Sequence, residues 1–173
     1  MKLDTTPLKN TRVLEIVESE LFQITLLTLL AISAPLFIKS PQLLVGSIVN
    51  FALFYSAKRF GLKKSLPIIF LPSLIAYSSN ILLGGATYFL IFFVPIILLS
   101  NSIYVLLIRY VKGGIFTIFL ASICKSLVLF LFAFVFVKEF GLPQLFLSSM
   151  GAMQLVTGLV GGGMGLFFSK KID

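Results

Sequence analysis

Long runs of apolar residues, separated by short polar turns, fill most of the sequence. A helix needs about 20 predominantly apolar residues to cross a bilayer, and the longer runs reach that length. They predict six transmembrane helices over residues 21–38, 42–57, 65–79, 88–110, 115–137 and 144–168. The predicted fold class is therefore an all-α integral membrane protein with one transmembrane domain over residues 21–168.

Polar segments flank this domain. Residues 1–20 contain several acids and bases, which is not typical of a signal peptide. They are predicted to be a solvated cytoplasmic lead-in; the alternative is a short helix in the membrane interface. Residues 169–173 are predicted to form a short cytoplasmic tail. Within the domain, the uncharged and glycine-rich residues 80–87 predict a loop or a broken helix, whose backbone needs protein or water around it at membrane depth.

The composition supports the membrane class and excludes several functions. Hydrophobic residues make up 58% of the 173 residues and charged residues 12%, whereas soluble proteins average about 25% charged residues. The chain has no histidine and a single cysteine, Cys124. An internal disulfide is therefore excluded, as are the usual haem, zinc and iron–sulfur sites. We expect no cofactor, no nucleic-acid partner and no enzymatic activity, because no catalytic constellation or basic–aromatic pattern is present.

The distribution of lysine and arginine predicts the orientation in the membrane. Eleven of the 14 basic residues lie before the first predicted helix, in or next to the second and fourth connections, or in the tail. Lys39 and Lys138 lie on the opposite side. Both termini are therefore predicted to face the cytoplasm, with the protein in the cell membrane.

One charge, Lys125, lies near the middle of the predicted helix 115–137. A lysine at that depth costs about 3 kcal/mol or more on insertion scales, and all six acids lie outside the predicted spans, which disfavours a proton- or cation-coupled carrier. One hypothesis makes Lys125 the counter-charge for an anionic ligand in a polar pocket. The other makes it a structural lysine that hydrogen-bonds Asn50, Gln154 or freed backbone carbonyls, or that burial keeps deprotonated.

Three of the amide side chains inside predicted helices, Asn50, Asn101 and Gln154, are candidates for the same pocket. Asn50 shares a helix face with Gln42 and Gly46, because the three are spaced four residues apart. Asn101 and Gln154 lie in the fourth and sixth predicted helices. Each amide either lines a pocket or forms only an interhelical hydrogen bond.

The last predicted helix carries a seam of small residues. Its members recur at alternating spacings of three and four and are Gly151, Gln154, Gly158, Gly161 and Gly165. Glycine lets a neighbouring helix approach closely in lipid, so we expect a tight helix contact along this seam. Replacing Gly158 by leucine is predicted to destabilise the fold more than replacing Gly163, which lies off the seam.

Several segments resemble a small family of bacterial membrane proteins related to the substrate-binding S components of energy-coupling factor (ECF) transporters. The matching segments are QLLVGSIVNFALFYSAKRFG (42–61), LPSLIAY (71–77), VPIILLSNSIYVLL (94–107), Lys125 with LVLFLF just after it, and MQLVTGLVGG (153–162). The resemblance covers about residues 40–168. It implies a monomeric S-component-like bundle that captures a vitamin-like solute near the outer face, through its last three helices and outer loops.

The resemblance also implies partners. An S component docks on a transmembrane coupling subunit that is driven by two ATPases, often through an A-x-x-x-A pattern on its first helix. Here Ala31 and Ala34 are three residues apart, so the pattern is absent. The candidate solute-contacting residues are Lys125, Asn101, Gln154, Asn50, Asn80 and Tyr77. The alternative function is a ligand-free membrane accessory or assembly protein, in which these residues only fix helix packing.

Overall fold

The computed structural model describes residues 19–38, 41–79 and 83–169, and these residues form helices and short turns without a strand. The predictions for residues 1–18 and 170–173 lie outside this part of the chain. In chain order the elements are α2 (Glu20–Phe37), α3 (Gln42–Arg59), α4 (Leu62–Ser79), the 3₁₀ helix η1 (Gly84–Phe89), α5 (Leu90–Tyr110), α6 (Ile115–Phe140), α7 (Leu145–Met150) and α8 (Ala152–Ser169).

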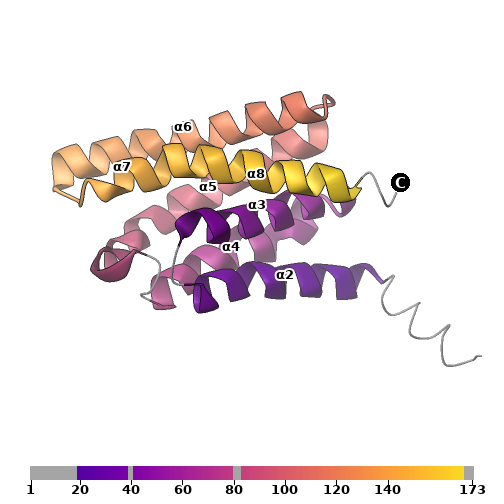
Figure 1. Cartoon of the computed structure of the whole chain (residues 1–173), viewed down its shortest axis with the longest axis horizontal. Helices are drawn as coiled ribbons and strands as arrows, with labels where there is room; N and C mark the ends of the chain where they lie inside the picture. The colour runs from indigo at the N-terminus through magenta and orange to yellow at the C-terminus, as the bar shows by residue number, and fades with distance from the viewer. Residues whose placement is uncertain (1–18, 39–40, 80–82, 170–173) are drawn as a thin grey trace, which may run out of the picture.

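The long helices lie roughly parallel or antiparallel to one another (Figure 1). Helices α6 and α8 pack together on one side of the bundle, and α2 and α4 pack together on the other. Helix α3 lies between them and touches α2, α4, α5 and α8. The most central helix is therefore the one that carries Asn50.

Four segments of the described chain are long and apolar enough to cross a membrane: Glu20–Phe37, Gly84–Tyr110, Ile115–Phe140 and Leu145–Ser169. Their outward faces carry large exposed apolar side chains, such as Leu29, Phe92, Phe119 and Val160. An apolar outer surface of this extent is unusual for a soluble monomer and suits contact with lipid. The all-α class and the membrane character are thus supported by the structure.

Helices α3 and α4 fall outside this set, because polar and basic residues lower their mean hydropathy. For α3 the physical reason is its position. A helix surrounded by other helices is shielded from lipid and can carry polar side chains that bond to its neighbours. The six-span topology therefore remains a prediction.

The last predicted helix, over residues 144–168, is wrong in one respect. It is broken at Gly151 into the short α7 and the longer α8. Gly151 accordingly does not lie on the face of α8, and the Ser126 hydroxyl donates to its carbonyl over 3.0 Å. A second difference is that α4 begins at Leu62, three residues before the predicted helix 65–79, so Pro67 lies in its second turn.

The remaining seam glycines bring α8 against two helices. A methyl group on Gly158 would meet the Ser122 hydroxyl of α6 at 2.7 Å, whereas one on Gly163 would meet nothing within 4 Å. Gly161 faces backbone atoms of α3, and Gly165 faces the Phe54 ring of the same helix. The seam therefore holds α8 between α3 and α6.

Candidate functional site

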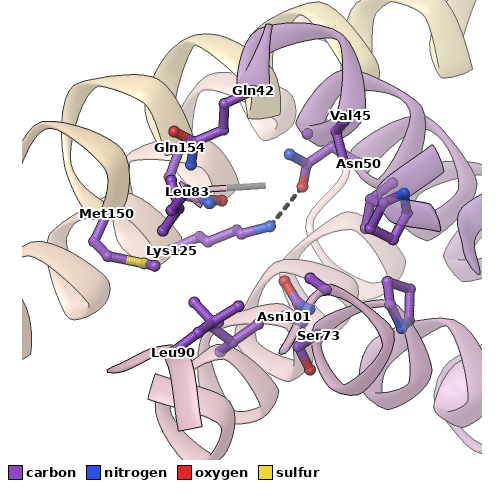
Figure 2. Close-up of a pocket in the computed structure, with 16 residues that line it drawn as sticks. Gln42, Val45, Asn50, Ser73, Leu83, Leu90, Asn101, Lys125, Met150 and Gln154 are labelled. Atoms are coloured by element: carbon purple, nitrogen blue, oxygen red, sulfur yellow. Dashed lines mark hydrogen bonds between the residues drawn. The ribbon is translucent and has the colours of Figure 1, made fainter. Parts of the chain in front are cut away.

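A cavity of about 80 Å³ lies inside the bundle, toward the end where α2 and α4 finish and α3 and α5 begin. Apolar side chains form much of its wall, including Val45, Leu90 and Met150. Its polar and charged side chains come from five helices: Gln42, Asn50, Ser73, Asn101, Lys125 and Gln154 (Figure 2). Pockets of this kind, apolar with a few convergent polar groups, are the usual sites of small-molecule binding.

Lys125 reaches into this cavity from α6 and is only 2% exposed. Its Nζ donates a hydrogen bond of 2.6 Å to Asn50 Oδ1 and lies 5.5 Å from the centre of the Tyr104 ring. Both partners are neutral, so the ammonium has no countercharge among the residues that the structure describes. An aromatic face stabilises a cation by about 0.5–2 kcal/mol, which offsets only part of the burial cost.

The described acids lie far from this charge. Glu20 pairs with Lys64 where α2 and α4 meet at the opposite end of the bundle. Glu139 is exposed near the end of α6, 14 residues after Lys125, which corresponds to roughly 21 Å along a helix. Among the described residues, no carboxylate reaches the cavity.

Asn50 connects the lysine to α8. Its Nδ2 donates to Thr157 Oγ1 over 3.1 Å, and Thr157 Oγ1 in turn donates to the Gln154 carbonyl over 3.3 Å. A lysine ammonium can only donate, so Asn50 must turn its oxygen toward Lys125 and its nitrogen toward Thr157. Gly46 of α3 lets Thr157 of α8 come this close to α3, because a Cβ at position 46 would lie 2.7 Å from Thr157 Cγ2.

Asn101 enters the cavity from α5, and its orientation is also fixed. Its Nδ2 donates to the Ile69 carbonyl over 3.0 Å, and a carbonyl can only accept. The nitrogen of the Asn101 amide therefore faces this carbonyl, and the oxygen takes the other position. This oxygen is buried and has no hydrogen-bond partner within the described parts of the chain.

Four of the six predicted solute-contacting residues meet at this cavity: Lys125, Asn101, Gln154 and Asn50. Tyr77 lies outside the cavity lining and packs, half-buried, against the apolar cluster around Phe93. Asn80 lies outside the described residues. The seam glycines are packing residues and do not line the cavity.

Two residues that position the site, Tyr104 and Thr157, were not predicted from the sequence. Tyr104 is fully buried, and its hydroxyl donates to the Gly158 carbonyl over 3.2 Å. The available signal was helical spacing, because each lies three residues after a predicted pocket residue and so shares its helix face. Ser73 also lines the cavity, but no such spacing distinguishes it from other serines of α4.

Comparison with models of known protein families, with curated protein sequences and with solved structures gives no match.

Proposed function

We propose that this protein is a multi-pass protein of the cell membrane that binds a small anionic solute in the cavity around Lys125, as the solute-binding component of an ECF-type uptake transporter. One observation carries the proposal. A lysine buried at mid-helix borders a cavity, and its described partners are all neutral. An anion in the cavity would supply the missing countercharge, and a charge-assisted hydrogen bond is stronger than a neutral one.

The location of the cavity agrees with capture from outside. It lies near the turns that precede α3 and α5, where the described chain carries few basic residues. At the opposite end are Lys58, Arg59, Lys63, Lys64, Arg109 and Lys112. Since basic residues favour the cytoplasmic side, the cavity belongs to the outer half of the proposed six-span bundle.

The cavity volume bears on the size of the solute. A volume of about 80 Å³ exceeds the roughly 10–15 Å³ that one water molecule needs and has room for a few waters or one compact solute. Drug-sized ligands occupy pockets of about 300–1,000 Å³. A larger, vitamin-like solute would therefore require helices at the cavity mouth to separate.

The alternative, a ligand-free accessory or assembly protein, is favoured by a different observation. The bonds that join Lys125, Asn50 and Thr157 link α6, α3 and α8, as expected of residues that only fix packing. The surface for docking on a coupling subunit also bears on the choice between these two functions. Ala31 and Ala34 are buried within the chain, so a coupling subunit with its two ATPases would have to use another surface of this protein.

Native mass spectrometry of the protein purified in mild detergent distinguishes the two functions. We expect a small acid to remain bound to the wild-type protein and to be absent from Lys125→Met. An equal amount of the same molecule on both proteins would contradict a role for Lys125 in binding.

Accessibility labelling tests the topology. In a Cys124→Ser background we expect Glu139→Cys to react with a membrane-impermeant maleimide on intact cells, and Lys63→Cys to react only after lysis. Both side chains are exposed in the structure, and neither is one of the turn glycines, Gly61 and Gly141, whose positive φ would strain a cysteine. Labelling of position 63 from outside would overturn the six-span arrangement.

A further inference from the structure

Asn101 presents a buried acceptor that its surroundings leave unused. The side chain is 3% exposed, its nitrogen is held by the Ile69 carbonyl, and its oxygen has no partner within the described residues. In Figure 2 this oxygen points toward the space in front of the Lys125 ammonium. A buried polar atom without a partner costs about 1–3 kcal/mol. A molecule in the cavity that donates a hydrogen bond to this oxygen would remove that cost.

The backbone of α4 holds the amide this way round. Asn101 Nδ2 donates to the carbonyl of Ile69, and a carbonyl can only accept. With its nitrogen engaged there, the amide can offer the cavity only an acceptor.

Lys125 offers the opposite chemistry at the same cavity. An ammonium has three N–H donors, and the structure shows one of them bound, to Asn50 Oδ1. The Tyr104 face lies near the ammonium but takes no directed hydrogen bond of the N–H···O kind. The cavity therefore presents donors that suit an anionic oxygen and, separately, an acceptor that suits an O–H or N–H group.

We propose that the cavity recognises a compact hydroxy- or amino-carboxylate by two points: Lys125 binds the carboxylate, and Asn101 Oδ1 accepts a hydrogen bond from the hydroxyl or amino group. This inference rests on the proposed function, because it assumes that an acid enters the cavity, and it adds the second recognition group. A plain carboxylate would fill the same space but leave the Asn101 oxygen buried and unpaired. Sites built to bond a hydroxyl discriminate strongly against analogues that lack it.

Matched pairs of acids that differ by one hydroxyl test this proposal: lactate with propionate, 3-hydroxybutyrate with butyrate, and malate with succinate. Their affinities for the detergent-solubilised full chain are measured by isothermal titration at constant ionic strength. In at least one pair we expect the hydroxy acid to bind about ten-fold more tightly. In Asn101→Leu we expect that ratio to fall to about one, while the affinity for the plain acid changes little.

Ser100→Ala is the matched control. Ser100 is buried on the same helix, but its hydroxyl bonds its own helix at the Ile97 carbonyl and does not line the cavity, so this variant should keep the wild-type ratio. Equal binding of the two acids in every pair by the wild-type protein would overturn the two-point proposal and leave the anion site intact. Binding of none of the acids would contradict the proposed function itself, with water as the occupant of the cavity.

Discussion

Lys125→Met should reduce the affinity for the tightest-binding acid at least ten-fold without lowering the melting temperature of the protein. A ten-fold loss corresponds to about 1.4 kcal/mol, which is close to the lower end of the range for a hydrogen bond to a charged group, about 1.5–3 kcal/mol. Methionine fills most of the lysine volume and removes the buried charge. Isothermal titration and a thermal melt on the same preparation measure both quantities.

Two opposing effects set the expected stability. Without Lys125, Asn50 Oδ1 loses its donor, and a buried unpaired acceptor costs about 1–3 kcal/mol. Against this, replacing buried charges by apolar groups of similar volume is often neutral or stabilising. Because Lys125 has no carboxylate partner among the described residues, we expect the second effect to equal or exceed the first.

Lys125→Arg should restore binding only in part, because a planar guanidinium does not fit a site shaped for a compact ammonium. Lys138→Met serves as the control, since Lys138 is an exposed lysine near the end of the same helix; it should leave acid binding and melting unchanged. If Lys125→Met melts at a lower temperature but binds acids like the wild type, Lys125 is a structural lysine and the accessory-protein function gains support.

The second large effect is expected from the α8 glycines: Gly161→Ala should destabilise the protein by about 1–3 kcal/mol, whereas Gly163→Ala should stabilise it by up to about 1 kcal/mol. A Cβ at position 161 would collide with the Ser47 carbonyl and the Phe51 nitrogen of α3. Backbone atoms within a helix cannot move aside, so the two helices must separate, and overpacking has a cost of this size. At Gly163 there is open space, and alanine is the better helix former.

Gly158 should give an intermediate result. Its Cβ would meet the Ser122 side chain, which can change rotamer, so Gly158→Ala should destabilise less than Gly161→Ala. Gly158→Leu should still destabilise the fold more than Gly163→Leu. Thermal or denaturant unfolding in a fixed detergent provides the measurement. Similar losses at positions 161 and 163 would show that α8 does not present this face to α3.

Sequence pattern alone determined the class and most helix bounds of this protein. Five of the predicted helices agree with α2 to α6 to within a few residues, because apolar runs and basic or glycine-containing turns are local signals. The same pattern failed at the last helix. In the sequence, Gly151 continues the glycine seam. The alternating spacing of three and four residues is the same on both sides of the break, so the spacing does not show where one helix ends and the next begins.

The pairing of polar groups was decided only by the tertiary structure. Sequence pattern placed Lys125 at mid-helix and left it a choice of partners, because residues 75 positions apart in the chain are brought together only by packing of α6 against its neighbours. The orientation of Asn101 could not be read from its own helix either. It depends on the Ile69 carbonyl of α4, and the way an amide turns depends on which neighbouring group can only accept or only donate.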